Sequence, residues 1–445
     1  MKKIAIIFAS IVMLLGSVFK SEAGEFLNKH LSKWVNVDVQ LRNRYEWRSN
    51  FDFNDSAYDK DAYNLWRARL GLTLKPTDQL KLFYQFQDAR ISDDSTTGSK
   101  AAFENWVETR QLWVEYKIAK IGDTQLPGIG FKLGRQEISY GAQRLLGTFD
   151  WSNVAQTFDA GKVSLDFAPQ KLTFDVFGGG KTPVKAPREA DDFYDASAND
   201  RVGGYYATYK GIENVTVEQY VINRNTHGQN ISYGQTGDGQ VDDYTIGGRV
   251  VGKIVNTGFD YEVEAAKQVG NSGSLDVNAQ MAIVILGYTF KQKWNPRVSF
   301  EMDYASGDDN PTDDKRQTFD NLYPTNHPFY GYMDLVSLQN IHDYRFQIKA
   351  DPTKKLNLSA DYHIFYLDSE KDNLYAANRT IKRSTSAAAV EKFVGNEIDL
   401  LAKYQLNSYV GVLSGYSHFF AGDFLDQTGA NDDTDLFYVQ TIVNF

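Results

Sequence analysis

Basic residues recur at every second position along several stretches of this 445-residue chain. Arg42 and Arg44 alternate with apolar residues in one stretch, and Arg67 and Arg69 do so in the next. Side chains two positions apart on a strand lie on the same face of it. A guanidinium stays charged and binds a carboxylate through two parallel hydrogen bonds. The pattern therefore predicts strand faces that bind or guide anions, not a site that breaks bonds.

The same alternation selects further residues for this charged face, which we expect to be the lumen of a barrel. The predicted anion-guiding residues are Arg42, Arg44, Arg67, Arg69, Arg249, Arg297, Arg345, Lys349 and Lys403. Carboxylates share the face, at Asp38, Glu46, Glu301, Asp303, Asp343, Asp361, Glu397 and Asp399. Two interpretations stay open. Either the cations concentrate anions in a channel, or the mixed charges pair across strands and only hydrate and stiffen the wall.

Catalysis has little support in the sequence. Ser417 and His418 are adjacent on an alternating segment, so their side chains point to opposite faces and cannot form a dyad. The other histidines show no metal-ligand spacing. Gly178–Gly180 is a lone glycine run, which is too weak a pattern for a phosphate loop. We therefore expect no enzyme activity and no nucleic-acid or nucleotide partner.

Four loops are rich in aspartate, at 191–192, 238–243, 307–314 and 431–435. Oxygen-rich loops of this kind suit Ca²⁺, although none has the spacing of an EF-hand. The alternative is an ordinary solvated acidic loop. A structural Ca²⁺ ion is the one cofactor that this composition would accommodate, and otherwise none is expected.

The alternating segments predict an all-β fold, a single antiparallel transmembrane barrel of about 18 strands. We place the strands at 34–48, 66–75, 80–87, 105–119, 129–137, 156–168, 171–181, 201–210, 213–224, 243–256, 259–269, 276–290, 294–305, 341–351, 354–367, 393–405, 409–421 and 435–445. Long polar connections alternate with short ones such as KPTD, APQ and NTG. This asymmetry is typical of extracellular loops and periplasmic turns, so both termini should lie in the periplasm.

The two ends of the chain fit this architecture. Residues 1–23 carry Lys2 and Lys3 followed by an apolar stretch, which predicts a signal peptide and leaves 24–445 as one barrel domain. The last segment, 435–445, alternates and ends in an aromatic residue, and it must pair with the first strand because an open edge does not survive in lipid. The chain has no cysteine, 27 Tyr and 28 Phe. Aromatic girdles account for such a composition in outer-membrane barrels.

Four stretches of sequence resemble the alginate export family of outer-membrane porins. They are LGRQEISYGAQRLLGTFDWSNVAQTFDA from Leu133, FEMDYASGDDNPTDDKRQTFDNLYPTNHPFYGYMDL from Phe300, GNEIDL from Gly395 and GYSHFFAGDFL from Gly415. The first departs from the family pattern at Ala142 and Gln156. The resemblance also adds Arg135, in the GRQ motif, to the predicted lumen residues. Alternation places Arg135 on the face of Phe131 and Leu133, so either a bulge turns it inward or it lies above the membrane.

The resemblance implies a monomeric outer-membrane channel for passive diffusion or secretion of an anionic polysaccharide such as alginate. Its partners would be membrane lipid, the polymer and a periplasmic export machine. The family's gating turn corresponds here to the short segment Gln405–Ser408. Two alternatives remain, a porin that takes up small anionic solutes and a plugged surface barrel that serves adhesion or assembly. The aromatic-rich segment 306–340 would fold over or into the mouth, or pack with neighbouring loops.

Overall fold

The computed structural model describes residues 33–55, 61–92, 103–118, 127–184, 199–226, 240–386 and 391–445. The predicted signal peptide therefore lies outside the described residues. Consecutive strands pair antiparallel into one 19-stranded sheet, of which the two-residue β14 is not a wall strand. Subtracting it leaves 18 wall strands, as the alternation predicts. Among the described residues, no helix is long and apolar enough to span a membrane.

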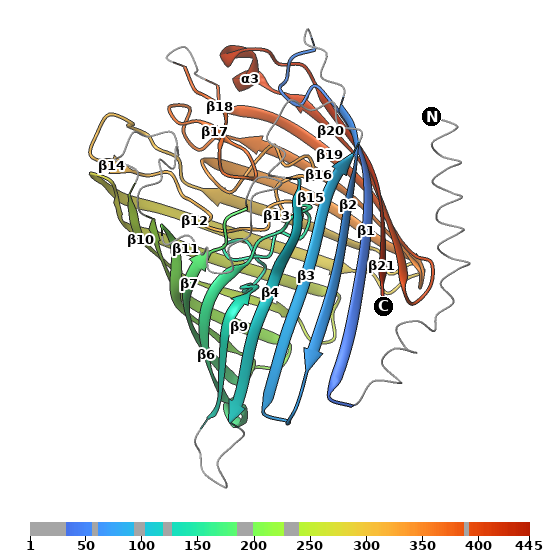
Figure 1. The fold of residues 1–445 in the computed structure, drawn as a ribbon. Helices are drawn as coiled ribbons and strands as arrows, with labels where there is room; N and C mark the ends of the chain where they lie inside the picture. The colour runs from blue at the N-terminus through green and yellow to red at the C-terminus, as the bar shows by residue number, and fades with distance from the viewer. Residues whose placement is uncertain are drawn as a thin grey trace.

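The wall strands keep the order of the chain around the barrel (Figure 1). They are β1 (Val35–Ser49), β2 (Asp61–Leu74), β3 (Leu80–Ser92), β4 (Asn105–Ile118), β5 (Gly128–Gln136), β6 (Phe158–Phe167), β7 (Leu172–Lys181), β8 (Asp200–Tyr209), β9 (Val215–Thr226), β10 (Val241–Lys253), β11 (Phe259–Ser272), β12 (Leu275–Thr289), β13 (Arg297–Ala305), β15 (Ile341–Thr353), β16 (Leu356–Tyr366), β19 (Phe393–Gln405), β20 (Val410–Ala421) and β21 (Thr434–Asn444).

Shorter elements lie in the connections. They are η2 (Ala168–Gln170), β14 (Lys315–Arg316), the hairpin of β17 (Leu374–Tyr375) and β18 (Ile381–Arg383), and α3 (Asp423–Thr428).

Pairing of the first strand with the last closes the barrel. β1 and β21 run antiparallel, with Gln40 opposite Asn444 and Ser49 opposite Asp435. The terminal residue completes the ladder, because the N–H of Phe445 donates to the carbonyl of Val39 at 2.9 Å. The predicted closure is confirmed, and the sheet has no open edge at this seam.

Alternation along each strand separates an apolar outer face from a polar inner face. In β2, Trp66 and Leu70 are 46% and 47% exposed, whereas Arg67 and Arg69 between them are 2% and 6% exposed. A cation on a lipid-facing position at mid-membrane costs about 2–4 kcal/mol, so this register is strongly favoured over its one-residue shift. The charged face is the lumen.

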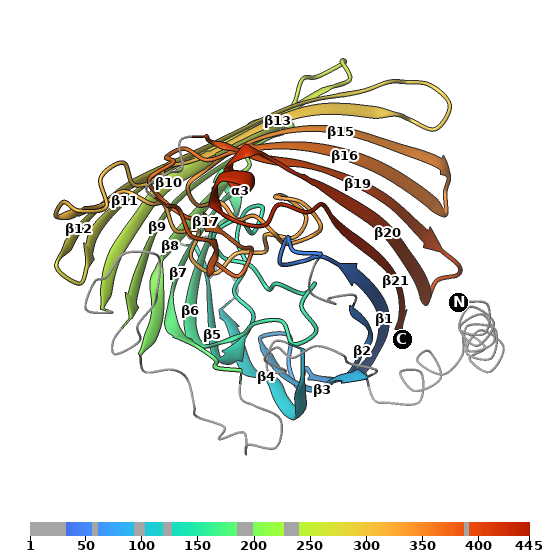
Figure 2. The same ribbon diagram turned by 90° about the horizontal axis from the view of Figure 1, so that it is seen from above.

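The two ends of the barrel differ. At one end, which we call the turn end, tight turns join β2 to β3, β6 to β7 and β10 to β11. The opposite loop end carries the long connections, and two that bear on the site fold into the lumen. They are the β5–β6 loop, residues 137–157, and the β13–β15 loop, residues 306–340; seen from the loop end, both lie inside the ring of strands (Figure 2). The segment 306–340 thus folds into the mouth of the barrel, which is one of the placements that the sequence left open.

Candidate functional site

The β5–β6 loop lies against the arginines of β1 and β2. Arg42 and Arg67 are directly opposite each other in the strand register, where like charges destabilise a sheet. Both side chains are buried, and both donate to backbone carbonyls of the loop. Arg42 donates to Asp150 at 2.7 Å and to Ser152 at 3.1 Å, and Arg67 donates to the same carbonyls at 3.2 and 3.3 Å. Two predicted lumen arginines thus anchor the loop.

A loop carboxylate completes this contact. Asp150 Oδ2 lies 3.0 Å from Arg67 Nη2, and its Oδ1 lies 2.7 Å from Arg69 Nη1. Burial opposes ionisation of this carboxyl, but the charges of Arg67, Arg69 and Arg42 outweigh it and hold the pKa of Asp150 well below its usual range. We call Arg42, Arg67 and Arg69 the arginine cradle. The carboxylate compensates the like charges that the strand register brings together.

Trp151 connects Arg44 and the two inward loops. Arg44 binds Glu46 at 2.6 Å and the carbonyl of Trp151 at 2.8 Å, and its guanidinium lies 3.6 Å from the centre of the Trp151 ring. The same indole stacks on His327 of the β13–β15 loop at 3.7 Å between ring centroids, and Tyr438 of β21 packs edge-on against it at 5.0 Å. Guanidinium, indole and imidazole therefore lie close together in the lumen, and packing of each loop depends on the other.

The opposite end of the β5–β6 loop reaches an acidic part of the wall. Arg144 is almost fully buried, and it binds Glu262, Glu264 at 3.5 Å and Glu301 at 3.0 Å. These glutamates stand on β11 and β13, far around the barrel from β1 and β2 (Figure 2). The loop thus crosses the lumen with an aspartate on the basic wall and an arginine on the acidic wall.

Three other predicted arginines pair with carboxylates on nearby strands of the wall. Arg249 binds Glu218 at 2.7 Å and Glu262 at 2.9 Å. Arg297 binds Asp260 at 2.6 Å, and Arg345 binds Asp361 at 2.7 Å and Glu301 at 3.3 Å. For these residues the structure has the cross-strand pairing that the sequence left as an alternative.

The two predicted lysines are different. Lys349 and Lys403 lie on the lumen face near the turn end, and both are exposed. Within the part of the chain that the structure describes, neither has a carboxylate within 4.0 Å. Lys349 faces Arg297 directly across the strand register, again a like-charge pair. These lysines leave cationic charge accessible from the lumen.

Arg135 lies opposite Leu112 of β4 and Asp159 of β6 in the strand register. Phe131 and Leu133 of the same strand are exposed, whereas Arg135 is buried. Asp159 accepts from it at 2.9 and 3.1 Å, and the carbonyl of Thr109 accepts from it at 3.1 Å. Arg135 thus pairs with a carboxylate of the wall, and its place among the lumen cations stays a prediction.

Strand β4 carries a lysine-flanked aromatic that the sequence reasoning missed. Trp113 has Lys81 Nζ 5.0 Å and Lys132 Nζ 4.1 Å from its ring. Lys132 faces Lys162 directly; among the described residues Lys162 binds Asp175 at 3.2 Å, whereas Lys132 has no carboxylate within 4.0 Å. On its other side Lys132 faces Glu115 of β4 in the register. Alternation along these strands puts all three lysines on the polar face, but none of them is among the predicted anion-guiding residues.

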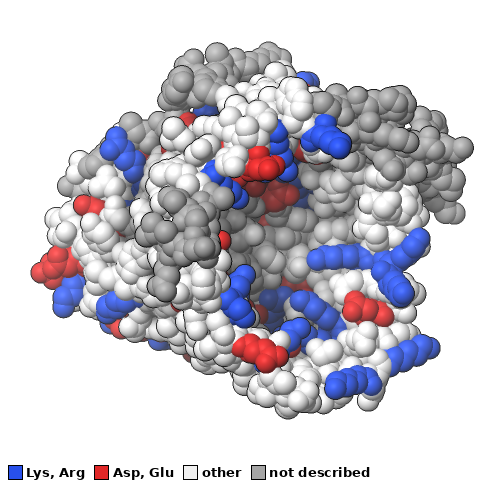
Figure 3. All heavy atoms as spheres, turned by 90° about the horizontal axis from the view of Figure 1, so that it is seen from below, with Lys and Arg blue, Asp and Glu red and all other residues white. Residues whose placement is uncertain are grey.

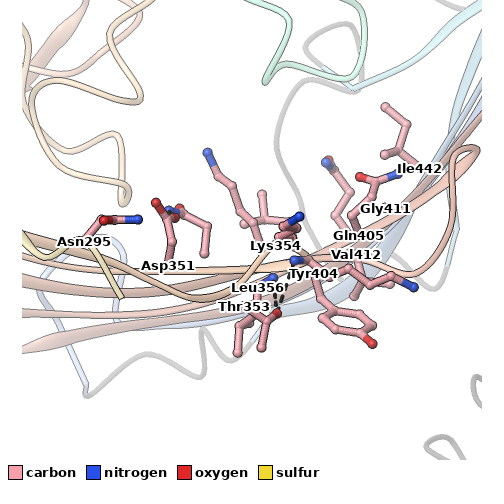
Figure 4. A pocket seen from close by; sticks show the side chains of 15 residues that line it. Asn295, Asp351, Thr353, Lys354, Leu356, Tyr404, Gln405, Gly411, Val412 and Ile442 are labelled. Atoms are coloured by element: carbon pink, nitrogen blue, oxygen red, sulfur yellow. Dashed lines mark hydrogen bonds between the residues drawn. The ribbon is translucent and has the colours of Figure 1, made fainter. Parts of the chain in front are cut away.

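The turn end opens into a hollow around which Lys and Arg side chains gather (Figure 3). A cavity of about 820 Å³ lies there, between the β15–β16 turn, the β19–β20 turn and the start of β20 (Figure 4). Lys403, Asn357, Gln405 and Gln440 are among its lining residues. Basic groups together with side-chain amides suit a hydroxylated anion.

The predicted Ca²⁺ loops lie partly within the described residues. In the described residues, no group of three or more His, Asp or Glu side chains is placed to hold an ion. In the loop 307–314, Asp308 instead accepts the backbone N–H groups of Asn310 at 3.0 Å and Gln317 at 3.2 Å. Residues 191–192 and 238–239 lie outside the described residues, so a Ca²⁺ site stays a prediction.

Ser417 and His418 point to opposite faces, as predicted. Ser417 is buried and donates to Asp399 of the lumen face, whereas His418 binds Asp435 at 2.9 Å on the outer face. The two side chains form no dyad.

Solved structures share this fold. OccK10 (OpdN) of Pseudomonas aeruginosa has a TM-score of 0.60 at 12% identity, over 93% of this chain and 99% of that one. A BenF-like porin from Pseudomonas fluorescens Pf-5 gives 0.60 at 13% identity, over 93% and 99%. OccK2 (OpdF) of P. aeruginosa in complex with glucuronate gives 0.58 at 11% identity, over 92% and 96%.

Among curated proteins, no sequence gives a significant match. The family model for alginate export matches residues 33–439, nearly the whole of the described chain. Together with the porin-like fold, this match identifies an outer-membrane channel. The chain belongs to the alginate export family.

Proposed function

We propose that this channel conducts small anionic saccharides, of the size of a sugar acid or a short oligomer, across the outer membrane by passive diffusion. The observation that carries the proposal is the like-charge pairing of basic residues on the lumen wall. Arg297 faces Lys349, and Lys132 faces Lys162. Among the described residues, Arg297 and Lys162 each bind a wall carboxylate, whereas Lys349 and Lys132 have none within 4.0 Å. Glu115 faces Lys132 across the β4–β5 register and offsets part of its charge, and a mobile anion in the lumen would offset the remaining repulsion.

Two further observations support a solute of this class. The turn-end cavity combines Lys403 with side-chain amides, which suit a carboxylate and sugar hydroxyls respectively. A structural neighbour, OccK2, is described in complex with glucuronate, a sugar carrying one carboxylate. The two loops that occupy the lumen favour a small solute over a thick polymer.

Secretion of an anionic polysaccharide such as alginate is the second candidate, and membership of the alginate export family favours it. It would require a periplasmic export machine and an extended chain threaded past the inward loops. In either case we propose a monomer with the turn end and both termini in the periplasm. No cofactor is needed for diffusion.

Proteoliposome swelling tests the proposal. Glucuronate and glucose are similar in size and differ by a carboxylate, so the ratio of their swelling rates reports the charge preference. We expect glucuronate to enter faster than glucose. Oligouronates of increasing length should enter progressively more slowly, whereas undiminished passage of long chains would favour the polymer conduit. Equal rates for glucuronate and glucose would refute an anion preference.

Lys349→Gln tests the wall charge itself. A unit charge acts on a carboxylate about 4 Å away with about 1 kcal/mol in water, so the glucuronate-to-glucose ratio should fall by up to about fivefold. Lys267→Gln is the matched control, because Lys267 is exposed on the outer face of β11 beside Val263 and Val269. The control should leave the ratio unchanged. An equal effect of both variants would mean that lumen position is irrelevant.

A further inference from the structure

We propose that Asp150 is a tethered competitor, a carboxylate of the protein that occupies a binding site for the carboxylate of the solute. The site is the arginine cradle of Arg42, Arg67 and Arg69. Passage of the solute would involve exchange of one carboxylate for the other. The inference rests on the proposed function and adds a specific subsite and its built-in inhibition.

Loop anchoring and carboxylate binding use different atoms. The backbone carbonyls of Asp150 and Ser152 accept from Arg42 and Arg67, at 2.7–3.3 Å. The carboxylate of Asp150 accepts instead from Arg67 Nη2 and Arg69 Nη1, at 3.0 and 2.7 Å. The side chain can therefore leave the cradle while the backbone keeps the loop in place.

Exposure indicates which partner can move. The side chains of Arg67 and Arg69 are 0% and 7% exposed, but that of Asp150 is 46% exposed. The guanidinium groups are fixed in the wall, since Arg67 also donates to Gln40 at 2.8 Å and Arg69 to Gln87 at 2.6 Å. Asp150 therefore forms the solvent-accessible surface of the cradle, and an anion in the lumen would meet the cradle from the side of Asp150.

The exchange conserves charge and hydrogen bonds. An unpaired guanidinium in a buried site is costly, so the cradle would hold a neutral sugar poorly. A solute carboxylate offers the same two acceptor oxygens as Asp150, and the freed aspartate can turn toward water. The competitor weakens net binding of the solute, and weak binding is what a conducting channel requires.

Asp150→Asn tests the inference, because the amide keeps the size of the side chain and the backbone anchors but removes the competing charge. The measurement is block of single-channel current by glucuronate, with glucose as the neutral reference. We expect the half-blocking concentration of glucuronate to fall at least fivefold, and block by glucose to stay as in the wild type. An unchanged or raised half-blocking concentration would overturn the inference.

Two controls separate the possible outcomes. Glu218→Gln removes a lumen carboxylate of β9, away from the cradle, and its partner Arg249 keeps Glu262, so it should change glucuronate block less than twofold. An equal effect of Glu218→Gln would overturn the inference in favour of general lumen charge. If Asp150→Asn does not fold, Asp150→Ser also lacks the carboxylate, and the same fall is expected.

Failure of the proposed function gives a different result. A wild-type channel that shows neither anion preference nor glucuronate block would refute the anion channel itself. A wild-type channel that glucuronate blocks, with Asp150→Asn blocked no more tightly, would refute only the competitor. Increased passage of glucose through Asp150→Asn would mean that the loop has moved, and Asp150 would then be a structural anchor.

Discussion

Arg144→Met should release the acidic-wall end of the β5–β6 loop. Arg144 binds Glu262, Glu264 and Glu301 with 1% of its side chain exposed. Removing one partner of a buried ion pair typically costs about 3–5 kcal/mol, because the remaining charge stays buried and uncompensated. Glu262 keeps Arg249 and Glu301 keeps Arg345, so the lower end of that range applies. When the loop undocks, the glutamates become hydrated again. The loss therefore destabilises the docked state much more than the undocked state. A weakening of docking by about 3 kcal/mol corresponds to roughly a hundredfold change in its equilibrium.

A single introduced cysteine measures this docking, because the native chain has none. Leu145 is 5% exposed in the docked loop, so Leu145→Cys should react slowly with a pyridyl disulfide reagent. In the Arg144→Met background we expect the reaction to be about a hundredfold faster. Arg249→Met is the matched control, since Arg249 also binds Glu262 but stands on the wall. Equal acceleration in both backgrounds, or none with Arg144→Met, would refute the crossing-loop account.

Three further predictions concern the same loop and its wall. Folding lowers the pKa of Asp150, so the ionised carboxylate stabilises the docked loop fully above the unfolded pKa near 4. That stabilisation is lost only as pH falls through the lower folded pKa. The Leu145→Cys reaction, corrected for reagent reactivity, should therefore stay slow from pH 7 to pH 4.5. Trp151→Ala removes the ring between Arg44 and His327 and should speed that reaction about tenfold at constant pH. Gly134→Ala should lower the melting temperature, because Gly134 has φ +123° and the added Cβ would lie 2.2 Å from the Leu112 carbonyl oxygen.

Alternation along the chain predicted the barrel because lipid and lumen impose opposite polarity on neighbouring residues. The strand count, the seam between β1 and β21 and the inward direction of Arg42, Arg44, Arg67 and Arg69 all follow from that constraint. The identity of each cation's partner does not follow from it. Asp150 lies 83 residues from Arg67 along the chain, in a loop whose path depends on packing within the lumen.

The site therefore differs from the simplest sequence prediction. The arginines chosen as anion guides are held by the protein's own groups, whereas the accessible cations are lysines such as Lys349 and Lys403. Strand parity treats all these residues alike, because it specifies the face and not the neighbours. Arg135 shows the same limit, since alternation could not reveal that its partner is Asp159 of the neighbouring strand.

The reversal potential of the wild-type protein in a planar bilayer under a salt gradient tests the central claim most directly. An open barrel with uncompensated lumen lysines should give a reversal potential with the sign of an anion-selective channel. In Lys349→Gln this reversal potential should move toward zero. A cation-selective current would contradict the proposed anion channel. A barrel with negligible conductance would contradict it too, and would favour a plugged barrel whose loops carry the function.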